Sequence, residues 1–239
     1  MNIIKKLFAH THYQKKEEKL LKSLFEKNLK GKSLLDIGCG RGKYLHLLSP
    51  ICSSVTGVDA NPTQVNKLRK EGFETYTPED FPRDNKYDVI LMSHIIEHFD
   101  TNGLIELIDT YLALLDEDGI LIILTPMPGD RFWHDYTHVR PYTPQSLGML
   151  FGILDGPAAF DRKQKMRLQN IWFFRDSWRI RNNRYYYPSE FVIQNNIKFR
   201  IFEKVITVLN IILSGLHAIS NGRLGVISSW VGIYRKDAS

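Results

Sequence analysis

Three glycines at alternate positions follow an aspartate in the stretch Asp36-Ile-Gly38-Cys-Gly40-Arg-Gly42. A turn without Cβ atoms lets a ligand lie directly against the backbone. The carboxylate of Asp36 would point into the same crevice, where it would repel a phosphate and attract an ammonium group. These residue types at this spacing therefore favour a ligand with a positive amino group over one with a pyrophosphate.

Two other nucleotide-binding turns fail on spacing. A phosphate-binding P-loop needs Gly-x4-Gly-Lys-Ser/Thr after a strand, but Glu26 stands five residues before Gly31-Lys32-Ser33, and that triplet precedes the strand. A dinucleotide-binding turn needs a third glycine where Lys43 stands. The remaining pattern, Asp-x-Gly-x-Gly-x-Gly, suits S-adenosylmethionine (SAM), which carries an ammonium, a carboxylate and a sulfonium but no phosphate.

A second group of reactive side chains lies in the stretch Asp130–Arg140, which reads Asp-Arg-Phe-Trp-His-Asp-Tyr-Thr-His-Val-Arg. A loop that only turns the chain would not usually carry so many acid–base groups. We expect His138 to act as a general base, because a neutral imidazole can take a proton near pH 7, and Asp135 to orient it. The alternative is a structural Asp–His–Arg network that braces the loop. Further candidates are a catalytic His134 and, for an anionic group of the substrate, Arg131 and Arg140.

The run His94-Ile-Ile-Glu97-His98 matches a metalloprotease pattern of two histidine ligands around a catalytic glutamate. That chemistry needs the motif inside a long helix, whereas here it follows an apolar strand. Two interpretations stay open for Glu97 and His98. They form a polar turn at the methionine end of the bound cofactor, or they bind a divalent ion that orients a substrate oxygen. We predict no resident metal, with Glu97 and His98 as the candidate ligands if one binds.

Apolar runs and helical patterns alternate along the chain, as they do in α/β proteins. The predicted strands are Ser33–Asp36, Val55–Asp59, Phe73–Tyr76, Tyr87–Ser93, Gly119–Thr125, one within Arg167–Phe174 and one over Val226–Arg235. The predicted helices cover 14–29, 43–50, Pro62–Glu71, Asn102–Leu115, Thr143–Leu154 and Ile197–Ser220. Because ligands gather outside the carboxyl ends of parallel strands, the glycine turn and the Asp130–Arg140 stretch should face one edge of the sheet.

Four of these stretches, in this order, resemble the motifs of class I SAM-dependent methyltransferases. They are LLDIGCGRGKYL around the glycine turn, GVDANP (Gly57–Pro62), YDVILMSHIIEHF (Tyr87–Phe99) and LLDEDGILIILTP (Leu114–Pro126). The resemblance covers the region from about residue 30 to residue 130. It implies SAM as the cofactor and an α/β, Rossmann-like, seven-stranded, mostly parallel sheet with helices on both faces and strand order 3-2-1-4-5-7-6.

The resemblance also implies how the remaining cofactor contacts are made. Asp59 ends the second strand, where an acid can accept hydrogen bonds from both ribose hydroxyls, and Ala60 would lie beside the ribose or adenine. The family commonly has an acid directly after the third strand, but Thr77 stands there, so the adenine contact passes to the residues just beyond it. The predicted cofactor-binding residues are Asp36, Gly38, Cys39, Gly40, Gly42, Asp59, Ala60, Glu79, Asp80, Phe81, Ser93 and His94.

The composition is that of a soluble globular protein, and its positive charge is local. The chain has 239 residues, 43% hydrophobic and 24% charged, and a net charge of +6. Ten Lys/Arg and three Asp/Glu lie between Asp161 and Arg200, which accounts for the whole excess. An anionic partner at one place is therefore expected. The two cysteines, Cys39 and Cys52, do not suggest a disulfide framework, and no apolar run of signal-peptide length follows Lys5 and Lys6.

The C-terminal third combines a basic-aromatic stretch, Trp178–Pro188, with a nearly all-apolar helix, Ile197–Ser220. The polar positions of that helix recur at spacings of 4-3-4-3 and predict one narrow wet stripe: Glu203, Thr207, Asn210, Ser214 and His217. Its uninterrupted apolar lengths fall below the roughly 20 residues that span a bilayer. A buried helix or a homodimer face is one interpretation, and a helix lying in a membrane interface is the other. No RNA-binding signature accompanies the arginines, so no nucleic acid is expected.

These observations predict one methyltransferase domain over residues 1–239, with an N-terminal helix at 14–29 and a substrate- or membrane-facing insertion at 155–224. Stretches similar to Asp135-Tyr-Thr-His-Val-Arg-Pro141 occur in methyltransferases of cell-surface glycan or lipid assembly. The resemblance therefore implies O-methylation of an anionic glycan, glycolipid or lipid-linked small molecule, in the cytoplasm or at the inner membrane face. The alternatives are a non-catalytic SAM-binding or membrane-peripheral module and, less favoured, a nucleic-acid methyltransferase.

Overall fold

The computed structural model describes residues 13–130, 132–156, 166–181 and 197–236. The contacts divide the chain into two compact units. The larger comprises residues 17–173 and 229–239, and the smaller comprises residues 1–16 and 174–228. The single domain predicted over residues 1–239 stays a prediction.

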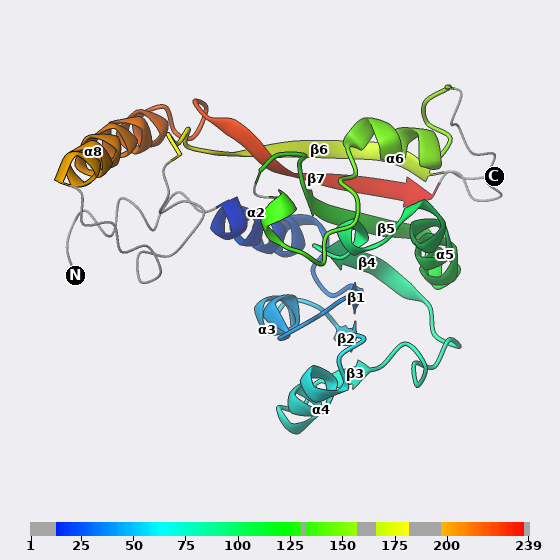
Figure 1. Cartoon of the computed structure of the whole chain (residues 1–239). Coiled ribbons are helices and arrows are strands. Elements are labelled where there is room, and N and C mark those ends of the chain that lie inside the picture. The colour runs from blue at the N-terminus through cyan, green and yellow to red at the C-terminus, as the bar shows by residue number, and fades with distance from the viewer. Residues whose placement is uncertain (1–12, 131, 157–165, 182–196, 237–239) are drawn as a thin grey trace. The chain divides into compact units, whose positions relative to one another are not determined.

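Seven strands form one sheet in the order β3-β2-β1-β4-β5-β7-β6 (Figure 1). The pairings from β3 to β5 are parallel, and β7 runs antiparallel to β5. This confirms the predicted fold class and strand order. The strands are β1 (Ser33–Ile37), β2 (Ser54–Val58), β3 (Glu74–Tyr76), β4 (Tyr87–Ser93), β5 (Leu115–Pro126), β6 (Met166–Asp176) and β7 (Val226–Lys236).

The central strands are long apolar runs because helices cover both of their faces. Val89 through Met92 on β4, and Leu121 through Leu124 on β5, are completely buried. Each such side chain contributes about 1.5–3 kcal/mol by leaving water. The rigid centre of the sheet therefore lies directly below the carboxyl ends of β1 and β4, where the order of the chain reverses.

The helices begin at residues that can cap them. Asn61 accepts backbone N–H bonds at the start of α4, Asp100 does so for α5, and Thr143 forms a capping box at α6. The described helices that precede β6 are α2 (Tyr13–Asn28), α3 (Lys43–Leu48), α4 (Pro62–Lys70), η1 (Ile96–His98), α5 (Thr101–Leu112), η2 (Phe132–His134) and α6 (Pro144–Leu150).

Two predicted boundaries are wrong for local reasons. The helix predicted to reach Leu115 ends at Leu112, because Leu115 already pairs with Tyr87 as the first residue of β5. The helix predicted to reach Leu154 ends at Leu150, because Gly152 adopts a left-handed conformation with φ 68°. Neither change moves the carboxyl ends of the strands.

The described part of the smaller unit includes the outer ends of β6 and β7 and the helix α8 (Ile197–Ile219). The hydroxyl of Ser228 donates to the carbonyl oxygen of Phe174 at 3.2 Å and joins the two strands here. The 23 residues of α8 make a helix about 35 Å long. It ends where Gly222 turns the chain with φ 79°.

Candidate active site

The glycine turn after β1 presents bare backbone. Gly38 and Gly42 have φ of 73° and 76°, and a Cβ on them would lie 2.3 Å from Ile95 Cδ1 and 2.4 Å from Leu68 Cδ2. A Cβ on Gly40 would have nothing nearer than the carbonyl oxygen of Gly38 at 4.0 Å. The outer glycines are thus required by packing, while Gly40 leaves open space for a ligand against the backbone.

Asp36 lies beneath this turn with only 1% of its surface exposed. Among the described residues, neither of its carboxylate oxygens has a hydrogen-bond partner. Burial, followed by the nearby charge of Asp59, raises the pKa of Asp36 to about 8. A buried acceptor without a protein donor is costly, so the geometry fits a ligand that brings a positive donor to this carboxylate.

Asp59, just after β2, joins the two turns at this edge of the sheet. Its Oδ2 accepts from the Gly40 backbone N–H at 2.7 Å, and its Oδ1 accepts from that of Asn61 at 2.8 Å. Each carboxylate oxygen has a second lone pair, so Asp59 can still accept from ribose hydroxyls. Ala60 is exposed beside it. The sequence did not reveal that Asp59 also holds the glycine turn in place.

The other predicted cofactor residues are differently placed. The Cys39 side chain packs into the core with Leu45 and Leu68, so only its backbone can meet a ligand in the turn. Phe81 is buried between Tyr76 and Tyr111, with ring centroids 5.7 and 6.2 Å away. Glu79 and Asp80 are exposed just before it, and the cofactor roles of all four residues stay predictions.

A chain of ion pairs and hydrogen bonds runs behind the end of β4. His94 Nε2 lies 3.1 Å from Glu17 Oε2, and His94 Nδ1 lies 3.4 Å from Glu97 Oε1. Burial lowers the pKa of His94, but hydrogen bonds to these two carboxylates outweigh burial and raise it to about 9. The chain continues from Glu17 Oε1 to the Ser229 hydroxyl at 2.6 Å, and from Glu97 Oε2 to that of Thr125 at 3.1 Å.

His94 therefore acts as a partly buried cation that links three distant segments, and its predicted role in cofactor binding stays a prediction. Its left-handed backbone, with φ 54°, is unusual for a residue other than glycine. Sequence reasoning missed Glu17. The available signal was its position four residues before Leu21 and eight before Phe25, on the helix face that becomes fully buried. Ser93, also predicted to bind cofactor, interacts with the buried phenol of Tyr44.

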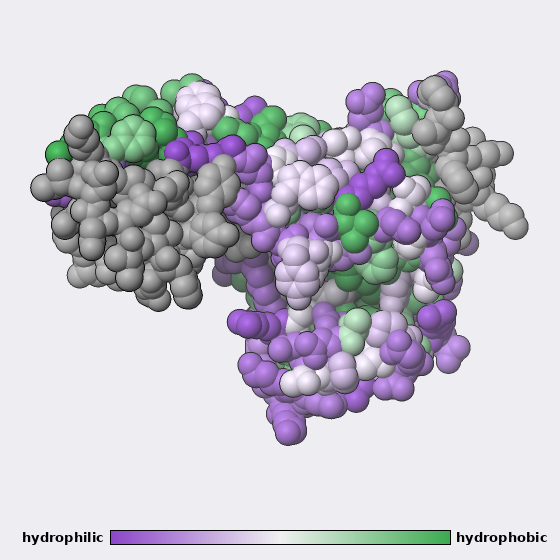
Figure 2. All heavy atoms as spheres, in the orientation of Figure 1, coloured by the Kyte–Doolittle hydropathy of each residue, from purple (hydrophilic) through white to green (hydrophobic). Residues whose placement is uncertain are grey.

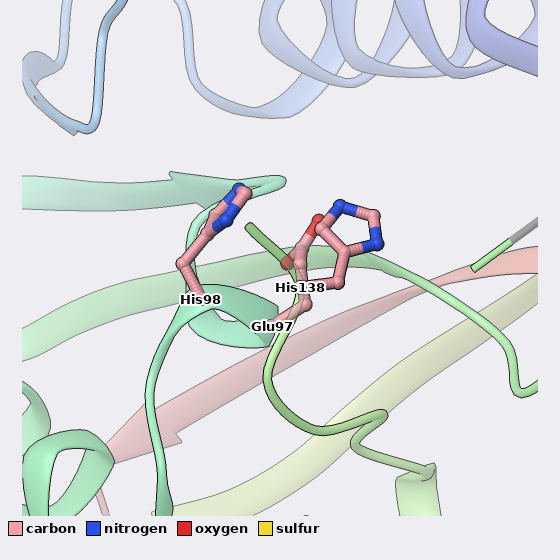
Figure 3. Close-up of side chains that lie close together, drawn as sticks. All are labelled: Glu97, His98 and His138. Atoms are coloured by element: carbon pink, nitrogen blue, oxygen red, sulfur yellow. The ribbon is translucent and has the colours of Figure 1, made fainter. Parts of the chain in front are cut away.

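The stretch after β5 is fixed onto η1 by its backbone. The N–H groups of Val139 and Arg140 both donate to the carbonyl oxygen of Glu97, at 2.8 and 3.2 Å. This places His98 and His138 edge to face with ring centroids 5.0 Å apart (Figure 3). Two segments that the sequence predicts separately thus form one cluster.

Backbone carbonyls determine the state of both histidine rings. His138 Nδ1 lies 2.8 Å from the Phe132 carbonyl oxygen, and His98 Nδ1 lies 3.1 Å from that of Thr137. Since a carbonyl only accepts, each Nδ1 carries a hydrogen, and in a neutral ring Nε2 is the basic nitrogen. Asp135 Oδ2 lies 3.8 Å from His138 Nε2, which places it to stabilise an imidazolium, while the Phe132 carbonyl orients the ring.

Glu97, His98 and His138 each offer one ligand atom, and these atoms lie within 4.8 Å of one another. A carboxylate with two imidazoles is a donor set that suits divalent transition metals. The sequence suggested Glu97 and His98 as candidate ligands, and the structure adds His138. The absence of a resident metal stays a prediction.

The remaining candidates lie around this cluster. His134 is exposed on η2. Arg140 Nη1 donates to the hydroxyl of Thr101, the first residue of α5, at 2.5 Å. Its guanidinium lies over the Tyr142 ring, 5.7 Å from the ring centroid. Arg131 lies outside the described residues.

Comparison with known proteins relates this chain to methyltransferases. A family model described as a methyltransferase domain matches residues 8–192. The curated ubiquinone biosynthesis O-methyltransferase of Pelagibacter ubique (strain HTCC1062) is 34% identical over 109 residues, 42% of this chain and 44% of that protein. The protein of the same name from Actinobacillus pleuropneumoniae serotype 7 is 31% identical over 40% of this chain and 46% of its own length. The chain thus spans less than half the length of these curated relatives.

Solved structures share the fold over nearly the whole chain. A SAM-dependent methyltransferase from Archaeoglobus fulgidus aligns with a TM-score of 0.54 and 23% identity, over 92% of this chain and 94% of that chain. The N-methyltransferase NodS from Bradyrhizobium japonicum WM9, in complex with S-adenosyl-L-homocysteine, aligns with a TM-score of 0.56 and 11% identity, over 96% and 90%. At these identities the likeness concerns the fold alone.

Proposed function

Because the chain belongs to the methyltransferase-domain family of class I SAM-dependent enzymes, we propose that it transfers a methyl group from SAM to a hydroxyl oxygen of a small molecule. The observation that carries this proposal is the buried Asp36 carboxylate, which among the described residues has no hydrogen-bond donor, beneath the bare Gly38–Gly42 backbone. Asp36 would hold the ammonium group of the cofactor, and Asp59 its ribose hydroxyls. SAM supplies a methyl group activated by its sulfonium.

The histidine cluster supports oxygen as the methylated atom. A hydroxyl becomes a better nucleophile as it loses its proton, and His138 Nε2 is the basic nitrogen of a ring whose Nδ1–H is held by Phe132. The Asp135 carboxylate, 3.8 Å from Nε2, would stabilise the imidazolium that results. A positioned base of this kind contributes about 10²–10⁴-fold, and alignment of the hydroxyl with the methyl group contributes further.

We infer that the acceptor is a lipid-linked phenol, glycan or glycolipid. The curated relatives are named for ubiquinone biosynthesis, and His138 belongs to the Asp135–Pro141 stretch that resembles enzymes of glycan or lipid assembly. The local charge between Asp161 and Arg200 favours an anionic acceptor. A phenolic hydroxyl is the most acidic of the hydroxyls considered, so it makes the least demand on a histidine base.

Two measurements test the proposal in order. Calorimetric titration with SAM should show binding that is about 10–100-fold weaker in Asp36→Asn and unchanged in Asp84→Asn, whose side chain is exposed. Extracts incubated with labelled SAM and the enzyme, then separated into lipid, glycan and protein, should carry the label in the lipid or glycan fraction. Binding without any labelled product would instead favour the non-catalytic module, and the absence of binding would refute the proposed cofactor.

A further inference from the structure

Helix α8 is oriented with most of its polar stripe turned inward, although Thr207 is exposed. Its most buried residues within the smaller unit are Glu203, Ile206, Ser214 and His217, with exposed fractions of 4, 3, 6 and 2%. Three of these four are polar and belong to the stripe that the sequence predicts to be wet. This reverses the usual arrangement of a surface helix, whose apolar stripe faces the protein.

Specific hydrogen bonds hold the stripe in this orientation. The Asn210 side chain accepts from the backbone N–H of Ile180 at 2.7 Å and donates to its carbonyl oxygen at 3.0 Å. The Ser214 and Ser177 hydroxyls lie 3.4 Å apart. These bonds satisfy both the helix and the chain that packs on it, so rotating α8 would leave several buried polar groups without partners.

The C-terminal turn of α8 is held in the same way. His217 Nδ1 donates to the carbonyl oxygen of Leu224, which leaves Nε2 to accept from the Lys16 ammonium at 3.2 Å. Lys16 also donates to the Arg175 carbonyl oxygen at 3.2 Å. Burial lowers the pKa of Lys16, partly offset by the charge of Asp176. The anchoring contacts therefore extend from Asn210 to the end of the helix.

The opposite side of α8 is apolar and exposed. Nine large side chains are 40–86% exposed there: Ile201, Phe202, Val205, Val208, Leu209, Ile211, Ile212, Leu216 and Ile219. Figure 2 shows hydrophobic residues gathered over this helix. At 100° per residue these positions cover roughly 180° of the helix circumference. Contiguous apolar patches of this extent mark interaction sites.

By length and composition, Ile201–Ile219 could cross a bilayer. Only 22% of this apolar stretch is buried, so it is not a core helix. Crossing would carry the inward stripe and its partners, Ile180, Ser177 and Lys16, into the hydrocarbon. Lying flat leaves those hydrogen bonds intact and immerses only the apolar side. The parallel orientation is therefore the one that the contacts permit.

We propose that α8 lies in the interface of an anionic membrane, with its apolar side among the lipid acyl chains. A single partner helix covers a stripe of about 100°, whereas acyl chains adapt to the roughly 180° arc found here. Trp178 is 44% exposed in the same unit, and the arginines Arg179 and Arg181 follow it. Such residues suit the headgroup layer, and the +7 excess over Asp161–Arg200 favours anionic lipid. This contact does not depend on the proposed methyl transfer.

Vesicle flotation with the full-length chain tests the proposal. The chain should float with phosphatidylcholine vesicles that contain about 30% phosphatidylglycerol, and bind vesicles of phosphatidylcholine alone at least about tenfold more weakly. The double variant Val208→Glu/Ile212→Glu should lose vesicle binding at least about tenfold, because it places two carboxylates at the centre of the apolar side. Circular dichroism and SAM titration should match the wild type.

The matched control is Ile153→Glu/Leu154→Glu, which changes two partly exposed apolar residues in the larger unit. It should float like the wild type. Equal flotation of Val208→Glu/Ile212→Glu and the wild type would overturn the proposal. A wild-type dimer in size-exclusion chromatography that this variant splits, without any flotation, would assign the surface to a second copy instead.

Discussion

The Nε2 atom of His138 can take a proton or bind a metal ion, but not both at once. Its Nδ1–H is occupied by the Phe132 carbonyl at 2.8 Å, so Nε2 is the one nitrogen left for chemistry. The neighbouring His98 and Glu97 offer ligand atoms within 4.8 Å of one another and of His138. The proposed mechanism uses Nε2 as a base, and this choice has a direct test.

Replacing His138 with alanine should lower kcat by about 10²–10⁴-fold while the SAM dissociation constant changes little, because the base acts on the acceptor. Asp84→Asn, at an exposed position outside this stretch, should stay within about twofold of the wild type. Turnover of a phenolic acceptor with labelled SAM measures the activity of both variants.

Removal of divalent ions with EDTA should leave wild-type turnover unchanged. Loss of activity that added metal restores would assign Nε2 to a ligand role.

Asp36 should make SAM binding depend on pH. Its pKa is raised to about 8 by burial and by Asp59, so without ligand it is largely protonated at neutral pH. An ammonium group binds the carboxylate, so binding releases a proton and affinity should rise from pH 6 toward pH 8. Above that, the ligand amino group itself loses its proton.

Titration in two buffers of different ionisation enthalpy measures the released proton. In Asp36→Asn the affinity should fall by about 10–100-fold, the loss expected for a charged hydrogen bond, and its rise with pH should disappear. A wild-type affinity that is flat across this range would show that Asp36 does not change its protonation on binding.

At the scale of elements, His94 joins α2, η1 and β7 through Glu17, Glu97 and, beyond Glu17, Ser229. Its pKa in the folded protein is raised to about 9, against a reference value of 6.5. A group whose folded pKa is raised stabilises the fold fully below the unfolded pKa. That stabilisation is lost as pH rises from about 6.5 through about 9.

The variant His94→Gln should therefore be destabilised by on the order of 2–3 kcal/mol at pH 6 and by much less at pH 9.5. Urea unfolding at several pH values gives the difference between variant and wild type, which cancels the contributions of all other titrating groups. His46→Gln is the control, because its ion pair with Glu71 is half exposed and should change stability little. A constant difference across this range would mean that His94 is neutral in the folded protein.

At the scale of the whole molecule, ligand binding should stabilise the chain by mass action. SAM at a hundred times its dissociation constant adds about 2.7 kcal/mol, which for a chain of this size raises Tm by about 5–10 °C. ATP at the same concentration should raise Tm by far less, because the Asp36 and Asp59 carboxylates disfavour phosphate in the turn. Differential scanning fluorimetry compares the two, and a larger shift with ATP would contradict the proposed cofactor.

The fold and the cofactor turn were readable from the sequence because local patterns encode them. Apolar runs determine which segments become central strands, and the Asp-x-Gly-x-Gly-x-Gly spacing requires a bare turn beneath a carboxylate. The predicted strand order is confirmed, with helix ends displaced where Leu115 pairs early and Gly152 reverses the backbone. These features depend on neighbours close in sequence or on rules common to all parallel sheets.

Three features were decided only by the tertiary structure. Glu17 and His94 are far apart in the chain, and only packing makes them partners and raises the pKa of His94. His98 and His138 meet because two backbone N–H groups bind the Glu97 carbonyl, an interaction that carries no side-chain signature. The periodicity of α8 revealed its polar stripe, but not that Ile180 and Lys16 would turn that stripe inward. A sequence pattern specifies which residues share a face, whereas the partners available in the folded chain decide which way that face points.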